Sequence, residues 1–164
     1  MDGSDGFVIN GIDGSDLSGI SVSGAGDISG DGVADLIIGA FGADPNGNSN
    51  AGESYVVFGG ALTGSTGTVE LSSLDGSDGF VINGINEDDR SGISVSGAGD
   101  INADGVADLI IGAFGADPNA NSSAGESYVL FGIPPISSLV CNGCLLYTSP
   151  SPRDQRGSRM PSSA

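Results

Sequence analysis

The sequence predicts an all-β fold made of antiparallel four-stranded sheets. Three observations favour this class: the chain contains an internal repeat, short apolar runs of strand character alternate with turn residues, and no stretch has a convincing helical period. Thirty of the 164 residues are Gly, which is typical of a chain with many tight turns. The length is enough for one modest domain.

The internal repeat organises the chain. Residues 2–59 recur as residues 75–132, and 49 of the 58 aligned positions are identical. A unit that recurs at a fixed period must stack on its neighbours to bury its apolar face. We therefore expect repeat 1 at about 2–59, a linker at 60–74 and repeat 2 at about 75–132, together forming a domain over residues 1–133.

The first two expected strands of each repeat differ in pattern. In the first, Phe7 and Ile9 fall on the same face. In the second, Ile20 and Val22 alternate with serines, which is the period of a half-buried strand. The expected ranges are 6–12 and 19–25 in repeat 1, and 79–85 and 92–98 in repeat 2.

The last two expected strands are more apolar. The run DLIIGAF is continuous, as in a strand covered on both faces, and ESYVVFG is rich in β-branched and aromatic residues. Their ranges are 35–41 and 53–59 in repeat 1, and 108–114 and 126–132 in repeat 2. Eight short antiparallel strands result. A four-stranded unit of this period predicts propeller blades, because 73 residues far exceed a β-solenoid rung.

A loop rich in oxygen ligands lies between the second and third strands of each repeat. Oxygen side chains occupy positions 1, 3, 5 and 9, Gly at position 6 permits a sharp turn, and the carbonyl at position 7 can add a ligand. These positions are Asp27, Ser29, Asp31, Val33 and Asp35 in the first loop, and Asp100, Asn102, Asp104, Val106 and Asp108 in the second.

This pattern predicts one Ca²⁺ site per repeat, two in total. Ca²⁺ takes six to eight oxygen ligands, and close carboxylates without a cation would repel each other. The loop is no EF-hand, because Ile38 and Ile111 stand where a bidentate Glu belongs. The alternative is an Asp- and Gly-rich hairpin turn without metal. We expect the first site to bind more weakly, because Ser29 replaces Asn102.

The loop, followed by LIIGAFGA and later by ESYVVFG, resembles the FG-GAP repeat of integrin α subunits and many bacterial surface proteins. The resemblance covers residues 1–133. It implies a β-propeller with Ca²⁺ held on these loops, and the same ten ligand residues. The chain departs from the family at Phe41 and Phe114, where Pro is frequent, and in its long period.

Two repeats are too few for the roughly seven blades of such a ring. We expect a partial, two-repeat fragment of a β-propeller, in which one blade is complete between about residues 19 and 85. Residues 6–12 would then be the outer strand of a preceding blade, and residues 92–132 three strands of a following one. Further blades of a longer parent chain are the expected partners.

The C-terminal residues differ in composition from the repeats. Residues 144–164 contain three of the four Arg and resemble translated sequencing-adapter read-through. We interpret them as a non-native, disordered tail that follows a linker at 134–143. The spacing of Cys141 and Cys144 suits a redox or half-zinc site, but Cys144 lies in that tail and no second pair exists, so chance explains it.

Charge restricts the function classes. The formal charge is −17, with no His, so nucleic acid and membrane insertion are poor expectations and the usual general bases are missing. We expect no enzyme, but a calcium-binding module of an extracellular or cell-surface protein that serves adhesion or ligand binding. A protein or carbohydrate ligand would bind on the face opposite the metal loops, where most differences between the copies fall. The alternatives are a propeller accessory to a secreted enzyme and a purely structural spacer.

Overall fold

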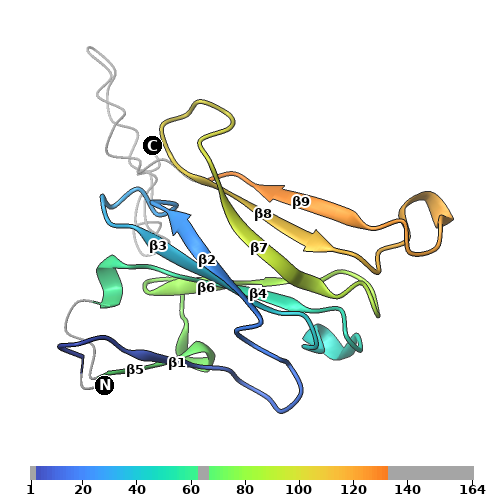
Figure 1. Ribbon diagram of the computed structural model, residues 1–164, viewed down its shortest axis with the longest axis horizontal. Coiled ribbons are helices and arrows are strands. Elements are labelled where there is room, and N and C mark those ends of the chain that lie inside the picture. Colours follow the sequence, from blue (N-terminus) through green and yellow to red (C-terminus); the bar gives the residue numbers. More distant parts are fainter. Residues whose placement is uncertain (1–2, 63–66, 133–164) are drawn as a thin grey trace, which may run out of the picture.

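The computed structural model describes residues 3–62 and 67–132. This part of the chain forms β-sheets stacked face to face (Figure 1). The strands are β1 (Val8–Asn10), β2 (Ser21–Gly26), β3 (Asp35–Ala40), β4 (Glu53–Val57), β5 (Thr68–Glu70), β6 (Gly79–Asn83), β7 (Ser91–Gly99), β8 (Asp108–Ala113) and β9 (Glu126–Leu130). The predicted all-β class of partial propeller is confirmed.

The middle sheet is the complete blade that the repeat pattern predicts. Its order is β2-β3-β4-β6, and all three pairings are antiparallel. Strand β6 therefore belongs to repeat 2 in sequence but closes the blade of repeat 1. Its register places Tyr55 opposite Val81 and Val56 opposite Phe80.

The third sheet contains the equivalent strands β7-β8-β9 of repeat 2, again antiparallel. Among the described residues, no strand pairs with the second edge of β9. This three-stranded sheet matches the incomplete blade expected from residues 92–132.

The prediction of eight antiparallel strands is wrong in one respect. The stretch that we interpreted as a linker contains a ninth strand, β5, which pairs in parallel with β1 over three residues. Val69 of β5 is β-branched and packs with Ile9 of β1 against the middle sheet. The segment was missed because only three residues of it are extended, too few to show alternation.

Two apolar layers hold the sheets together. The first lies between the middle and third sheets, and its buried members are Ala25, Ile28, Ile37, Val56, Val95, Leu109 and Ile111. The second lies between the middle sheet and the β1–β5 ribbon, and its buried members are Ile38, Ala40, Ala43, Tyr55, Val57 and Leu71. Neighbouring residues of β3 thus serve opposite layers, which confirms that this strand is covered on both faces.

Close backbone approach brings the middle and third sheets together. A Cβ at Gly39 would lie 1.9 Å from the carbonyl oxygen of Gly92, so no other residue fits there without a shift. Hydrogen bonds join the sheets as well. The amide of Val95 donates to Ser21 Oγ at 2.9 Å, and the amide of Ser91 donates to the carbonyl of Ala51 at 2.9 Å.

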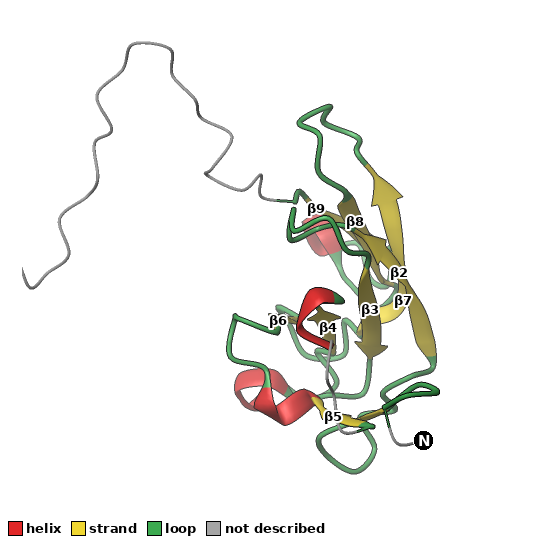
Figure 2. Cartoon of the chain, turned by 90° about the vertical axis from the view of Figure 1, so that its left-hand side faces the viewer, coloured by secondary structure: helices red, strands yellow, loops and turns green. Residues whose placement is uncertain are grey.

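The helical segments are single 3-10 turns in the connections (Figure 2). In the described ranges they are η1 (Pro45–Gly47), η2 (Gly60–Leu62), η3 (Leu71–Ser73) and η4 (Pro118–Ala120). No helix in that part of the chain is long and apolar enough to cross a membrane. The predicted linker at 134–143, the adapter-like tail and the two cysteines lie outside the described residues.

Candidate metal loops

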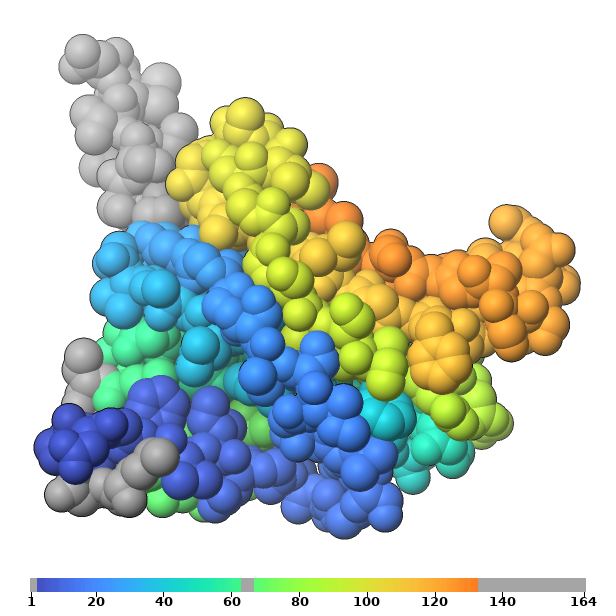
Figure 3. Space-filling view, viewed as in Figure 1, coloured from blue at the N-terminus to red at the C-terminus, as the bar shows by residue number. Residues whose placement is uncertain are grey.

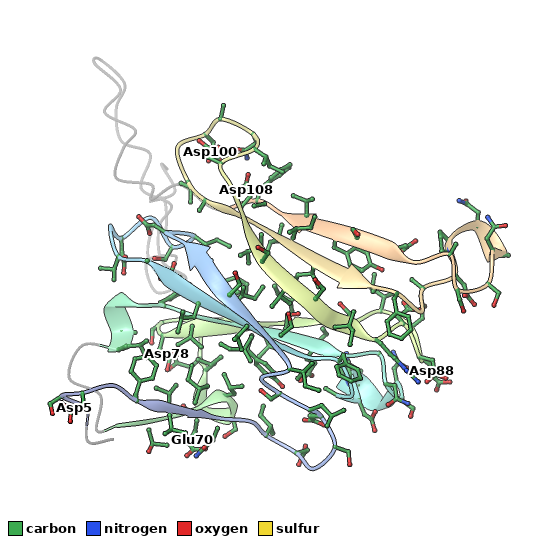
Figure 4. All side chains as sticks on the ribbon, viewed as in Figure 1. Asp5, Glu70, Asp78, Asp88, Asp100 and Asp108 are labelled. Atoms are coloured by element: carbon green, nitrogen blue, oxygen red, sulfur yellow. The ribbon has the colours of Figure 1, made fainter. Side chains whose placement is uncertain are left out.

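The two predicted metal loops occupy equivalent places. The first connects β2 to β3 and the second connects β7 to β8, and both reach beyond the same end of their sheets. Figure 4 shows Asp100 and Asp108 at this end of the third sheet and Asp88 at the opposite end. The long β4–β6 connection shares the end of the metal loops, since a Cβ at Gly60 would lie 2.3 Å from Asp31 Oδ2.

The first acid of each loop folds back onto the loop backbone. Asp27 Oδ1 accepts the amide of Asp31 at 3.0 Å, and its Oδ2 accepts the amide of Gly32 at 2.9 Å. In the second loop Asp100 accepts the amides of Asp104 and Gly105 at 3.1 and 2.9 Å. These bonds tighten each loop into a turn around one carboxylate.

The last acid of each loop is buried and holds the loop to the sheet. Asp35 is 1% exposed and accepts the amides of Ile28 and Ser29 through Oδ2 and that of Gly59 through Oδ1. Three backbone amides thus pair both oxygens of this buried carboxylate.

The counterpart in the second loop is Asp108, which is fully buried. It accepts the amide of Ile101 at 2.8 Å and that of Gly132 at 3.0 Å. Sequence reasoning assigned Asp35 and Asp108 as ligands only and missed this anchoring role. The signal was present, because each repeat ends in Phe-Gly at a fixed distance from the acid.

The middle positions of the loops carry the remaining predicted side-chain ligands. Asp31 Oδ1 accepts the amide of Val33 at 2.7 Å, and Ser29 Oγ lies 3.5 Å from Asp27 Oδ1. In the second loop, Asn102 Nδ2 donates to Asp104 Oδ2 at 2.9 Å. Asp104 Oδ1 in turn accepts the amide of Val106 at 2.9 Å.

The donor set suits a hard cation, because the side chains at positions 1, 3, 5 and 9 and the backbone carbonyl at position 7 all offer oxygen. Each carboxylate oxygen has two acceptor sites, and the amide bond to each Asp100 oxygen uses one of them, whereas Asp27 Oδ1 also lies 3.5 Å from Ser29 Oγ. Within the described ranges, however, no three acidic side chains are gathered closely enough to hold an ion as they stand. The structure thus brings the ligand residues into one loop each, but engages them with backbone amides.

Two substitutions distinguish the loops. Ser29 in the first corresponds to Asn102 in the second, and Gly30 corresponds to Ala103. Both Gly30 and Ala103 have positive φ, 72° and 62°. The second loop therefore holds an L-residue with a side chain in the left-handed region, which favours glycine.

The loop face opposite the metal loops carries an open hollow beside repeat 2. Its volume is about 470 Å³, and its lining is mainly acidic and hydroxylic: Glu87, Asp88, Arg90, Phe114, Asp117 and Ser123 contribute. The Arg90 guanidinium carbon lies 5.5 Å from the centre of the Phe114 ring. The contact is of the cation–π type.

A tyrosine beside a glutamate lies on β4 and again on β9. Tyr128 donates to Glu126 Oε2 at 2.5 Å, and Tyr55 donates to Glu53. Burial and then the neighbouring glutamate raise the pKa of Tyr128 to about 12. The same causes raise the pKa of Tyr55 further, because Tyr55 is 1% exposed.

Comparison with known proteins gives one family. The FG-GAP repeat family matches residues 18–57 and again residues 91–130. No curated protein matches the chain. The first matched segment begins three residues before β2 and ends with β4. The second begins with β7 and ends with β9.

Proposed function

The chain is an FG-GAP repeat protein, and on this premise we propose that it is a calcium-binding β-propeller repeat module of a larger extracellular or cell-surface protein. Its role in this proposal is adhesion or ligand binding, without catalysis. FG-GAP repeats assemble with further blades, and the sheet stacking seen here is the packing that such an assembly needs.

One observation carries the calcium proposal. The two loops differ at their third and fourth positions, yet Asp27 and Asp100 accept amides from the residues four and five positions later in both. The turn shared by both loops brings the carboxylate at position 1, Asp27 or Asp100, against the backbone of position 5. The side chains at positions 3 and 5 of each loop also end in oxygen. Small adjustments of Asp31 or Asp104 would then complete an oxygen shell.

Calcium would act on stability in this proposal. The loop acids contribute to a formal charge of −17, and a bound divalent cation would reduce their repulsion. Extracellular modules use calcium sites with dissociation constants of about 10⁻⁴–10⁻³ M. Binding to the folded chain alone raises its stability by mass action.

The ligand would bind on the loop face opposite the metal loops. Six of the nine differences between the repeats fall in these loops, and the hollow beside Arg90 offers carboxylates, hydroxyls and one aromatic ring. Such a lining suits hydroxyl-rich or basic groups, as on a carbohydrate or a protein surface.

The test of calcium binding is thermal unfolding of the full chain with and without millimolar CaCl₂. We expect calcium to raise the melting temperature, and Asp104→Ala to reduce that rise. Asp117→Ala is the matched control, because Asp117 also accepts a backbone amide, that of Ser123, but lies at the opposite end of the sheet. Equal calcium responses in the two variants would contradict the ligand assignment.

A further inference from the structure

The outer face of the third sheet is apolar and open, although its residues are identical to buried ones in repeat 1. Ile110 is 39% exposed and Val129 is 45% exposed, whereas their counterparts Ile37 and Val56 are fully buried. The same holds for Ile101, at 55% against 5% for Ile28. We call the surface formed by Ile101, Ile110, Val129 and Phe131 the back face.

A second open apolar surface lies on the other side of the molecule. A groove of about 410 Å³ separates β1 from β2 and β3, and Ile9, Val22, Leu36 and Ile38 line it. Val22 is 62% exposed, whereas its counterpart Val95 is 6% exposed. We call this surface the front groove.

The contact between the middle and third sheets shows how these two surfaces fit together. There, Ala25, Ile28, Ile37 and Val56 of repeat 1 pack against Val95, Leu109 and Ile111 of repeat 2. The first group corresponds by the repeat to the back face, and the second to Val22, Leu36 and Ile38 of the front groove. The chain therefore carries the residues of both halves of its internal interface a second time. The back face is exposed, whereas the front groove is open at Val22 and is covered at Ile38, which is 4% exposed beneath the β1–β5 ribbon.

Polar and backbone features of the internal interface are repeated as well. Gly39 lies close to the backbone of Gly92; of their counterparts, Gly19 has nothing within 4 Å of an added Cβ, and Gly112 meets only Ser94, at 3.6 Å. Ser21 Oγ accepts the amide of Val95, and its counterpart Ser94 is exposed. The two open surfaces thus match in backbone fit as well as in apolar residues.

A strand edge points to the same partner. Residues 6–12 and 79–85 are identical, GFVINGI, and in the second copy this sequence pairs as β6 with the free edge of β4. Strand β9 differs from β4 only at Leu130 and lacks such a partner among the described residues. Strand β1 pairs with β5 by one edge, and no strand of the described residues pairs with its other edge.

We propose that copies of this chain associate head to tail, the back face of one copy docking into the front groove of the next while β1 of the second copy extends the third sheet of the first. The register of β6 on β4 predicts that Tyr128 stands opposite Val8 and Val129 opposite Phe7. This inference goes beyond the proposed function and does not depend on calcium. The contact is heterologous, so it yields rings or open chains.

Sedimentation velocity of the full chain over a range of concentrations, with chelator present, tests the proposal. We expect species larger than a dimer to grow with concentration. Added salt should favour them, because copies of charge −17 repel each other. Ile110→Glu on the back face and Val22→Glu in the front groove should each leave a monomer.

Mixing the two variants identifies the geometry. Ile110→Glu retains an intact front groove and Val22→Glu retains an intact back face, so an equimolar mixture should form a one-to-one dimer and nothing larger. Phe131→Glu, at 54% exposure, repeats the back-face test at a second site. Ser72→Glu, at an exposed position of η3 outside both surfaces, is the control that should associate like the wild type. Circular dichroism verifies that each variant is folded.

The contrary outcomes are equally specific. If Val22→Glu associates normally while Ile110→Glu does not, the back faces pair with each other and the head-to-tail arrangement is wrong. A wild-type chain that stays monomeric at every concentration overturns the proposal. Strong protection of β9 amides from exchange in such a monomer would assign its edge to another part of the same chain.

Discussion

Repeat 1 and repeat 2 are nearly the same sequence in two different environments. Ile37 and Ile110 occupy equivalent positions in identical DLIIGA strands, yet one is fully buried and the other is 39% exposed. In the space-filling view, the segment around residues 115–125 projects from the body of the molecule, whereas the equivalent part of repeat 1 lies against its neighbours (Figure 3). Whether Ile37 and Ile110 are buried therefore depends on the adjoining sheet and not on their own sequence.

On the opposite faces of the two repeats, it is the residue of repeat 2 that is buried and the residue of repeat 1 that is exposed. Val95 of repeat 2 is buried against the middle sheet, and its counterpart Val22 is exposed. Each repeat is thus well packed on the face that meets the other repeat. The middle sheet gains a second cover only where the β1–β5 ribbon lies on it.

The largest difference between the repeats should appear on truncating the equivalent isoleucines. Ile37→Ala should lower the free energy of unfolding by about 2–5 kcal/mol, because it leaves a cavity between two sheets. Ile110→Ala should change it by about 0.5 kcal/mol or less, since the side chain is partly solvated. Urea denaturation at low protein concentration measures both, and similar losses would show that the back face is covered.

The buried loop acids should give the next largest difference. Removing an acceptor that serves backbone amides costs about 1.5–3 kcal/mol. Asp35→Ala should cost more than Asp108→Ala, because Asp35 accepts three amides and Asp108 two. Urea denaturation in chelator compares them. Asp31→Ala, an exposed acid that accepts one amide, is the control.

The backbone of the metal loops provides a smaller contrast. Ala103→Gly should stabilise the chain by about 1 kcal/mol, because a glycine adopts positive φ without a steric cost. Gly30→Ala should destabilise it by a similar amount. Thermal unfolding without calcium measures these shifts, and changes of the same sign in both variants would contradict the assigned φ values.

Calcium affinity should differ between the loops through Ser29 and Asn102. Ser29→Asn gives the first loop the amide ligand of the second, and we expect its affinity to rise by up to about tenfold, or about 1.4 kcal/mol. Calorimetric titration should then show two more similar sites. Two sites of equal calcium affinity in the wild type would contradict the predicted effect of Ser29 and Asn102.

The two tyrosines that donate to a glutamate, Tyr55 and Tyr128, should differ in the pH at which they ionise. A raised pKa means that the folded chain holds the phenolic proton more tightly, so this stabilisation is complete below pH 10 and is lost as pH rises toward the folded pKa. For Tyr128 the window is pH 10.0 to about 12, and Tyr55 should ionise later. Tyrosinate absorbance of Tyr55→Phe and Tyr128→Phe separates the two, and the reverse order would contradict the burial difference.

The repeat made much of the fold predictable. Eight strand positions, the hairpin placement of the acidic loops and the complete blade spanning both repeats followed from alternation, turn residues and the period of 73. Strand β5 did not, because its extended conformation depends on pairing with β1 across a sequence separation of 60 residues. Asp35 and Asp108 were predicted from the sequence as calcium ligands, but their burial and their hydrogen bonds with Gly59 and Gly132 required the fold.

By itself the sequence determined eight of the nine strands and the turns between them, since side-chain alternation and Gly, Asp and Asn preferences act over a few residues. Only the tertiary structure decided which identical side chains are covered. Ile37 and Ile110 have the same neighbours in the chain but different neighbours in space. Burial is a property of the surface that packs against a residue, and here that surface belongs to another repeat.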